Sequence, residues 1–341
     1  MPATAKLRVA IVSTMTGDNT DTSLEPTDLD LQEALADLLA VLDLTRVGET
    51  RSKVAMHEGG DALADIGAEV FIARSLRTSH HRVFGGQVLA QSIMAAGQTV
   101  RSIHPDRPIH SLHAYFLRTG DDSQPIRFAV EHLRDGHSFS ARRVYALQDG
   151  ETILTMTASF QDPAPGIEHQ RPMPVVPRPE ELDSLGEYYT GMDLPGTKQI
   201  IPRPIEHRHV QGNLYNAQAT HRSYKQSVWL RAVGALPDDP LLHAAVLAFA
   251  SDYTILETII REHQLVWSEP RLRAASLDHS MWFHRPVKFD DWVLYDQHSP
   301  SAQGGRGLGI GHIYSPDGLL LASVAQEGML RIKESLRAEA E

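Results

Sequence analysis

Apolar residues in the first part of the chain recur at helical spacing, and later they alternate with polar residues in short runs. Five leucines between positions 31 and 42 share one helical face, which predicts an amphipathic helix over residues 28–43 that starts at a Thr27/Asp30 capping box. Strand-like residues follow at 67–75. The run FGGQVLAQSIMAAGQTV after them is apolar around almost its whole circumference, so it predicts a helix that other elements enclose.

Four alternating segments follow this helix and are typical of a half-buried antiparallel sheet. Their sequences are SLHAYFLR, IRFAVEHLR, SFSARRVYAL and TILTMTASF. The dipeptides Asp135-Gly136 and Asp149-Gly150 separate the later segments, and Asp-Gly between alternating runs is a strong hairpin signal. A buried helix followed by such a meander predicts a sheet that curls around the helix.

The same order of elements returns after a proline-rich stretch, so the sequence predicts a tandem duplication. The stretch DPAPGIEHQRPMPVVPRPEEL holds six prolines and cannot form a central strand. After it come a helical run, LLHAAVLAFASDYTILETIIREH with a break at Ser251-Asp252, and four strand segments, including the glycine-rich GRGLGIGHIYS. Phe116 and Gly150 of the first copy align with Phe283 and Gly318 of the second.

This register gives a prediction for the organisation of the whole chain. We expect an N-terminal extension over 1–27, a first unit over 28–162, a linker over 163–220 and a second unit over 221–335. The predicted fold class is α+β, with each unit an antiparallel sheet curled around a long buried helix.

The duplication allows the two copies to be compared, and three polar groups occur in the second copy only. The aligned pairs are Asp252 with Gly85, Ser276 with about Ile109, and Gln326 with Ala158. A buried polar group without a partner costs roughly 1–3 kcal/mol, so the three side chains should meet one another. Taken singly, the aspartate could be a helix N-cap, the serine an ordinary strand hydroxyl and the glutamine the mark of a bulge. Their joint presence favours a site.

A carboxylate, a hydroxyl and an amide that converge can perform hydrolysis. Asp252 can accept a proton from water, while Ser276 and Gln326 hold that water for attack. We expect Asp252 to begin the second buried helix, so that the backbone N–H groups of Tyr253 and Thr254 can receive a developing oxyanion. A thioester suits this set, because a thiolate leaves without strong acid assistance.

Several motifs of the chain resemble those of type II acyl-CoA thioesterases, the TesB family of double hotdog proteins. The matching segments, in order, are VFGGQVLAQ (83–91), HSLHAYFLRTGD (110–121), LRDGHSFSARRV (133–144), MTASFQ (156–161), ASDYTIL (250–256), SLDHSMWFHRP (276–286) and VAQEGMLR (324–331). The resemblance implies a double hotdog and a site at Asp252, Ser276 and Gln326. It also implies hydrolysis of fatty acyl-CoA, of medium to long chain length, to free fatty acid and CoA. The family commonly has threonine where this chain has Ser276, which lacks the methyl group that restricts χ1, so water could be held less rigidly here.

Two other functions stay open from the sequence. A non-catalytic acyl-CoA binding module would use the same fold without turnover. An enoyl-CoA hydratase would need a closely spaced aspartate and histidine at a helix start, where this chain has Tyr253-Thr254 after Asp252.

Further candidates for substrate contact lie around these motifs. Gly85 and Gly86 precede the first buried helix, and His279 shares the segment of Ser276, where a structural hydrogen bond is favoured over service as a base. A basic cluster, Arg134, Arg142 and Arg143, is either a solvated strand edge or a binding site for the phosphates of coenzyme A.

Composition and signal sequences limit the classes of partner, cofactor and cellular location that we expect. A net charge of −11 argues against nucleic acid, and the absence of cysteine excludes disulfides and a thiol nucleophile. The 18 histidines show no metal-ligand spacing, so we expect no metal and no cofactor. There is no apolar run long enough for membrane insertion, and neither a secretory signal nor a peroxisomal signal is evident, so a cytoplasmic location is expected. A duplicated hotdog mimics a dimer internally, and further self-association through sheet faces to a homo-oligomer is expected.

Overall fold

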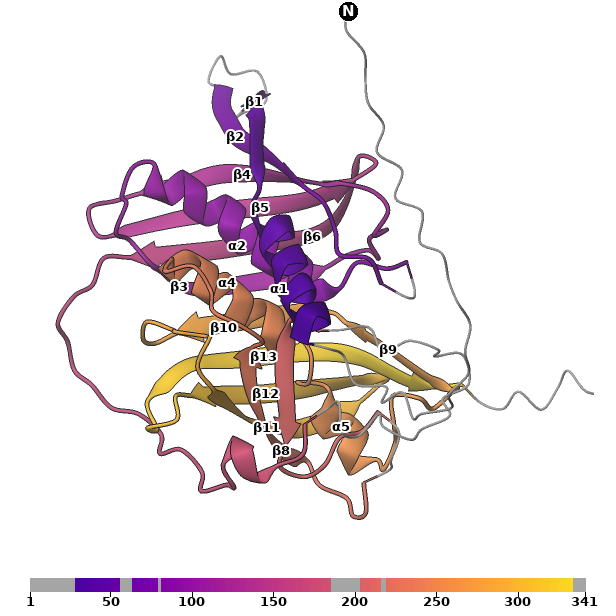
Figure 1. Cartoon of the computed structure of the whole chain (residues 1–341). Helices are drawn as coiled ribbons and strands as arrows, with labels where there is room; N and C mark the ends of the chain where they lie inside the picture. Colours follow the sequence, from indigo (N-terminus) through magenta and orange to yellow (C-terminus); the bar gives the residue numbers. More distant parts are fainter. Residues whose placement is uncertain (1–27, 56–62, 79–80, 185–202, 216–218, 334–341) are drawn as a thin grey trace, which may run out of the picture.

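The computed structural model describes most of the chain, and the arrangement of its elements is shown in Figure 1. The described residues are 28–55, 63–78, 81–184, 203–215 and 219–333. The predicted N-terminal extension over 1–27 lies outside them, as does the predicted capping residue Thr27. The unit boundaries predicted from the sequence stay predictions.

The first half of the chain has the predicted enclosed helix and meander, preceded by a helix and a hairpin. Its elements are α1 (Asp28–Leu42), β1 (Thr45–Ala55), β2 (Leu63–Ala73), α2 (Gly85–Arg101), β3 (Ile109–Phe116), β4 (Ile126–Asp135), β5 (Phe139–Gln148) and β6 (Glu151–Gln161). The hairpin partner β1 was not predicted, because TRVGETRSKVA lacks the alternation of a half-buried strand.

The described part of the second half repeats the order from β1 onward, with two differences. After the short 3₁₀ turn η1 (Pro179–Glu181) come β7 (Ile205–His209), β8 (Lys225–Ala232), α4 (Pro240–Ser251), α5 (Glu257–Glu262), β9 (Leu272–Ser276), β10 (Asp278–Phe283), β11 (Val293–Gln303), β12 (Arg306–Tyr314) and β13 (Leu320–Ile332). A second helix, α5, follows α4, and two strands, β9 and β10, stand in the place of β3. In the proline-rich stretch up to η1 the structure has no strand, and β7 lies at an edge of the sheet.

All described strands belong to one antiparallel sheet that runs through both halves. The order is β1-β2-β4-β5-β6-β3 in the first half and β10-β13-β12-β11-β8-β7 in the second, with β9 paired to β13. Strands β3 and β10 join the halves, with Leu112 opposite Met281. The strand order of one half is therefore mirrored in the other, as the duplication predicts.

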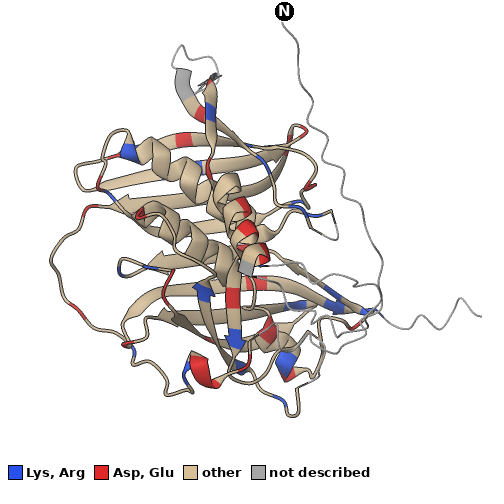
Figure 2. Cartoon of the chain, in the orientation of Figure 1, with Lys and Arg blue, Asp and Glu red and all other residues tan. Residues whose placement is uncertain are grey.

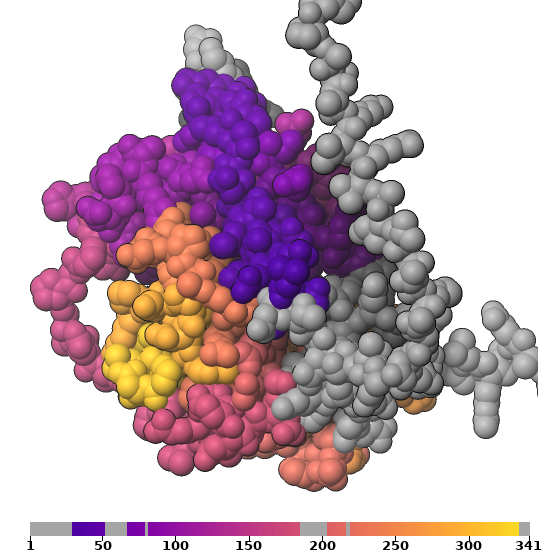
Figure 3. Space-filling model, viewed as in Figure 1, coloured from indigo at the N-terminus to yellow at the C-terminus, as the bar shows by residue number. Residues whose placement is uncertain are grey.

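The helices fill the concave side of this sheet (Figure 1). Helix α2 is buried from Gly86 to Gly97 and packs on β4, β5 and β6, which confirms that it is enclosed. Helix α4 packs beside α2, and a Cβ atom at Gly97 would overlap Leu241, so glycine allows the two helices their close approach. Helix α1 contributes Leu38 and Leu42 to the core, and Figure 3 shows it lying across both halves.

The glycine-rich strand β12 is explained by what packs against it. A Cβ atom at Gly309 would lie 2.6 Å from the carbonyl oxygen of Ile255, and one at Gly307 would lie 2.8 Å from the side chain of Ile259. The segment around α5 therefore rests directly on the β12 backbone, and glycine provides the space. Among the described helices, none has the length and hydropathy to span a membrane.

Candidate active site

Three side chains that the sequence selected lie in hydrogen-bond contact. Asp252 Oδ1 accepts a hydrogen bond from Gln326 Nε2 at 2.8 Å and one from Ser276 Oγ at 3.2 Å. Gln326 Nε2 also donates to Ser276 Oγ at 2.9 Å. The structure thus brings together the carboxylate, the hydroxyl and the amide, each from a different segment of the second half.

Strand geometry places two of these side chains. Gln326 lies in the middle of β13, on the face that points to the helices, and is fully buried. Ser276 is the last residue of β9, opposite Gly328, two residues further along β13. Residues two apart on a strand share a face, so the hydroxyl and the amide point to the same side of the sheet. Ser276 is only partly buried, so solvent reaches the site from its side.

The placement of Asp252 corrects one expectation. Asp252 ends α4 and does not begin a helix; a turn over 252–256 follows, and α5 starts at Glu257. The Tyr253 N–H donates to the Ala250 carbonyl at 3.2 Å, so it is not available for an oxyanion. The alignment of Asp252 with Gly85 therefore does not hold in the structure, because Gly85 is the first residue of α2 and α4 begins at Pro240. The backbone N–H of Thr254 stays a predicted donor.

The helix start that faces Asp252 belongs to the other half of the molecule. The Gly86 N–H at the N-terminus of α2 donates to Asp252 Oδ2 at 2.8 Å. A Cβ atom at Gly85 would lie 2.8 Å from the same carboxylate oxygen and 3.0 Å from the ring of Phe116. Gly85 therefore leaves space for the carboxylate, and the positive end of the α2 dipole stabilises its charge.

Gly86 has a packing role as well. A Cβ atom there would overlap the carbonyl oxygen of Phe249 and the ring of Phe84. The ring of Phe84 stacks on Tyr253 with centroids 4.7 Å apart and meets Phe249 edge-on at 5.1 Å. The two glycines thus allow an aromatic cluster to close beside the site, and their contact with substrate stays a prediction.

Burial governs the electrostatics of the site. Asp252 is only 9% exposed, and this desolvation raises the pKa of its carboxyl group. Opposing this, the nearby His279 and the hydrogen bonds from Gln326, Ser276 and Gly86 lower the pKa. Figure 2 shows that α2 and α4, which meet next to the site, carry almost no charged residues. A carboxyl group with a raised pKa in an apolar setting is suited to accept a proton.

Residues behind Gln326 extend the site beyond the three central side chains. His279 Nδ1 is in hydrogen-bond contact with Gln326 Oε1, and its Nε2 lies 3.1 Å from Ser251 Oγ. Tyr295 donates from its hydroxyl to the Ser251 carbonyl at 3.3 Å. The structural hydrogen bond favoured for His279 is present. The sequence did not indicate a role for Ser251 or Tyr295, because no residue pattern shows that the end of α4 and β11 are in contact.

The basic cluster does not form a single site. Arg142 is fully buried and donates to Thr99 Oγ1 at 2.8 Å and to Asp135 Oδ1 at 2.8 Å, so its predicted contact with phosphates is wrong. Adjacent strand residues point to opposite faces, and Arg143 lies on the outer face near Glu131. For Arg134 and Arg143, both exposed, phosphate binding stays a prediction.

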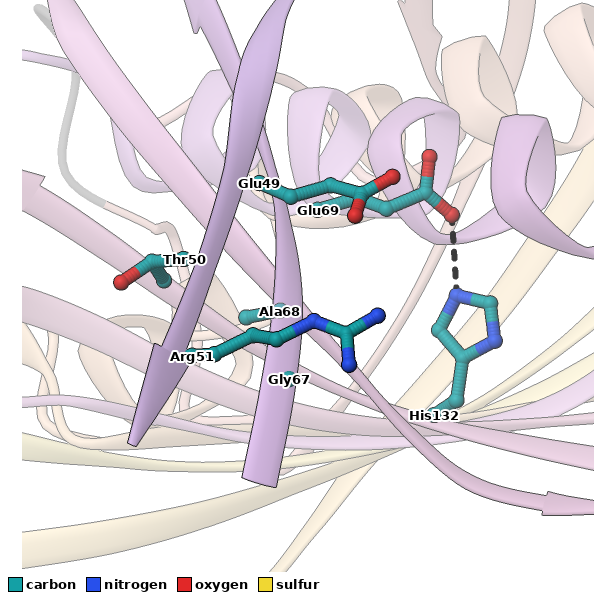
Figure 4. A pocket seen from close by; sticks show the side chains of 7 residues that line it. All are labelled: Glu49, Thr50, Arg51, Gly67, Ala68, Glu69 and His132. Atoms are coloured by element: carbon teal, nitrogen blue, oxygen red, sulfur yellow. Dashed lines mark hydrogen bonds and ion pairs between the residues drawn. The ribbon is translucent and has the colours of Figure 1, made fainter. Parts of the chain in front are cut away.

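A shallow pocket at the β1–β2 hairpin shares no residue with this site (Figure 4). Its carboxylate Glu69 accepts from Arg46 Nε at 2.7 Å and contacts His132 Nε2 at 2.9 Å. The residues that line it are Glu49, Thr50, Arg51, Gly67, Ala68, Glu69 and His132. Since Glu69 is already held by two cationic or polar partners, we assign the pocket no chemistry.

Two family models, both of acyl-CoA thioesterases, match this chain, one in each half. A family model described as acyl-CoA thioesterase matches residues 196–329. A model described as the acyl-CoA thioesterase N-terminal domain matches residues 73–161.

Individual relatives agree over most of the chain. Human acyl-coenzyme A thioesterase 8 is 38% identical over 286 residues, which cover 80% of this chain and 87% of the relative. The crystal structure of an acyl-CoA thioesterase II, TesB2 from Mycobacterium marinum, is 36% identical with a TM-score of 0.66 and covers 88% of this chain and 99% of that one. A hot dog fold protein of unknown function from Alicyclobacillus acidocaldarius, 18% identical, matches with a TM-score of 0.66 over 87% of this chain and 99% of its own. The predicted double hotdog fold is confirmed.

Proposed function

Because the chain belongs to the acyl-CoA thioesterase family, we propose that it hydrolyses fatty acyl-CoA with water activated at Asp252, Ser276 and Gln326. The observation that carries the proposal is the mutual hydrogen bonding of these three side chains. Ser276 and Gln326 are polar where the first half has Ile109 and Ala158, so the hydrogen-bonded set belongs to the second half alone.

The proposed reaction is a single water attack on the thioester. Asp252 accepts a proton from the water while the water oxygen forms a bond to the carbonyl carbon. The Ser276 hydroxyl and the Gln326 amide orient that water. The tetrahedral intermediate then collapses, the C–S bond breaks, and the CoA thiolate leaves. It takes the proton from Asp252, so the products are the free fatty acid and CoA.

The surroundings of the site support a fatty acyl substrate. Phe116 lies against Gly85, and the Phe84–Phe249–Tyr253 aromatic cluster lies beside Gly86. An acyl chain that lies on the partly buried rings of Phe84, Phe116 and Tyr253 would leave water for apolar contact at about 0.8 kcal/mol per methylene group. We therefore propose that medium and long chains are turned over better than short ones.

The decisive experiment is thiol release from a panel of acyl-CoA chain lengths, measured for the wild type and for Asp252→Asn. Without a carboxylate to accept a proton, we expect Asp252→Asn to lose activity by about a hundredfold or more. Asp149→Asn is the matched control, because Asp149 lies in a hairpin turn at φ 49°, a conformation that asparagine tolerates. Wild-type turnover by a folded Asp252→Asn, or acyl-CoA binding by the wild type without thiol release, would contradict the proposal.

The pH dependence of the same assay tests the state of the carboxylate. Burial raises the pKa of Asp252, and only the deprotonated form accepts a proton, so kcat/KM should fall on acidification at a pH above the ordinary aspartate value of about 3.9. A pKa raised by folding also means that the folded protein binds more protons. The contribution of Asp252 to the free energy of unfolding should therefore decline as pH rises through that range. An acid limb at the ordinary value would contradict a buried base.

We also include self-association and a cytoplasmic location in the proposal. The outer face at the joint between the halves supports self-association, because Tyr115 on β3 and Trp282 on β10 are 62% and 38% exposed there. Light scattering of the purified protein tests this, and fractionation of the host cell tests the location.

A further inference from the structure

His279 occupies a fully buried position directly behind the proposed site. It lies on β10 and faces the helices, where the equivalent residue of the first half is Leu112. Its ring bridges two polar groups, Gln326 on β13 and Ser251 at the end of α4. An imidazole at a position where the fold also accepts leucine calls for a reason other than packing.

The hydrogen bonds around Gln326 determine which ring nitrogen of His279 carries a proton. Gln326 Nε2 has two N–H groups, and they donate to Asp252 Oδ1 and Ser276 Oγ. Its Oε1 therefore faces His279 Nδ1, and an oxygen can only accept, so Nδ1 carries the proton. If the amide were turned around, its oxygen would oppose the Asp252 carboxylate.

The other side of the ring is held as well. Ser251 Oγ donates to the carbonyl oxygen of Ala248 at 2.8 Å and lies 3.1 Å from His279 Nε2. With Nε2 unprotonated, the single hydroxyl proton is shared between these two acceptors. The Tyr295 hydroxyl donates to the Ser251 carbonyl and ties this end of α4 to β11. The ring is thus fixed from α4 and from β13 together.

Several ionisable groups face the imidazole. Burial lowers the pKa of His279, while Asp252 and Asp278 oppose that shift. Tyr295 stays protonated, since burial raises its pKa well above the ordinary value. A lowered pKa keeps Nε2 unprotonated near neutral pH, which agrees with its role as acceptor from Ser251.

We propose that His279 is a positioning residue for the hydrolysis: its Nδ1–H fixes the Gln326 amide so that both amide N–H groups point at Asp252 and Ser276. This inference rests on the proposed function and extends it to a residue that touches neither water nor substrate. Without the imidazole donor, Gln326 can rotate, and Asp252 loses a hydrogen bond that lowers its pKa.

Two substitutions of His279 distinguish the effect of its hydrogen-bond donor from the effect of its packing. In His279→Leu, the residue present at the equivalent position 112, the donor is lost. We expect kcat to fall about tenfold or more with little change in KM, and the acid limb of the pH profile to move to higher pH. In His279→Asn the amide nitrogen can replace Nδ1, so most of kcat and the position of the acid limb should return.

The controls keep the outcomes distinct. His113→Asn changes an exposed histidine on the outer face of β3 and should leave kcat and the pH profile unchanged. If Asp252→Asn is inactive but folded His279→Leu keeps the wild-type kcat and acid limb, the positioning role is wrong and the proposed function stands. If His279→Asn is as defective as His279→Leu, the donor is not the reason. Should His279→Leu fail to fold, His279→Asn and Ser251→Ala carry the test, and the pH profile of Ser251→Ala should also shift.

Discussion

The two halves of the molecule share strand order and register, yet only the second holds the hydrogen-bonded set at Asp252. The difference is sharpest where the halves meet. Asp252 accepts a hydrogen bond from the Gly86 N–H, and its carboxylate occupies the space that a side chain at Gly85 would need. Gly85 is the first residue of α2, whereas Asp252 follows the last residue of α4, so the site combines the start of one half's helix with the end of the other's. A side chain at Gly85 would displace the Asp252 carboxylate, so the first half has no side chain at this contact.

The first half uses the freed positions for packing. Ile109, Leu112 and Ala158, the counterparts of Ser276, His279 and Gln326, are buried and belong to the hydrophobic core. Polar groups that would need partners have become apolar contacts. The half with the proposed site therefore has polar side chains at these three positions, and the half without it has apolar side chains that stabilise the core.

The largest effect on activity is expected from a second carboxylate at the contact between the halves. In Gly85→Asp, the new side chain would overlap Asp252 Oδ2 and bring a second negative charge into an apolar site. We expect nearly complete loss of thiol release and a fall of about 3–5 kcal/mol in the free energy of unfolding, measured in urea. Gly166→Asp is the control, because a side chain there meets open space, and it should change neither quantity. A Gly85→Asp protein with normal turnover would show that the carboxylate does not need this space.

The next largest effects are expected from exchanging the residues at the equivalent positions 326 and 158. Gln326→Ala removes a donor to Asp252 and should lower kcat by roughly 10²–10³-fold. Ala158→Gln places an amide in the apolar core of the first half and should cost about 1–3 kcal/mol of stability with little effect on kcat. Equal loss of activity in the two variants would contradict the assignment of chemistry to one half.

The smallest effect is expected at Ser276. Ser276→Thr keeps the hydroxyl between Asp252 and Gln326 and adds the methyl group that restricts χ1. We expect a rise in kcat of about twofold, with an unchanged acid limb, from steady-state thiol release. A marked loss instead would mean that the pocket at Ser276 has no room for a methyl group.

The residue pattern predicted most of this fold and brought out the three central side chains. The enclosed helix, the β4–β5 and β5–β6 hairpins and the repeated order of elements follow from period and turn residues, and the comparison of the two copies brought out three polar groups of the second copy. The residue pattern did not predict the positions of side chains and helix ends that depend on tertiary contacts. Asp252 follows the end of α4, so its predicted alignment with the first residue of α2 does not hold. Arg142 and Arg143 are neighbours on a strand and therefore point to opposite faces, which separates the predicted basic cluster. The roles of Ser251 and Tyr295 depend on segments that are distant in sequence.

The pairing of β3 with β10 has a consequence for any attempt to divide the protein. These strands form five residue pairs in the interior of a continuous sheet, so each supplies the other with backbone partners. A fragment that ends before the second half would expose a bare row of N–H and C=O groups along β3, a template on which other chains can assemble. It would also carry an α2 whose first amides had lost their carboxylate acceptor. Expressed alone, either fragment should aggregate, and a mixture of the two should regain solubility together with turnover.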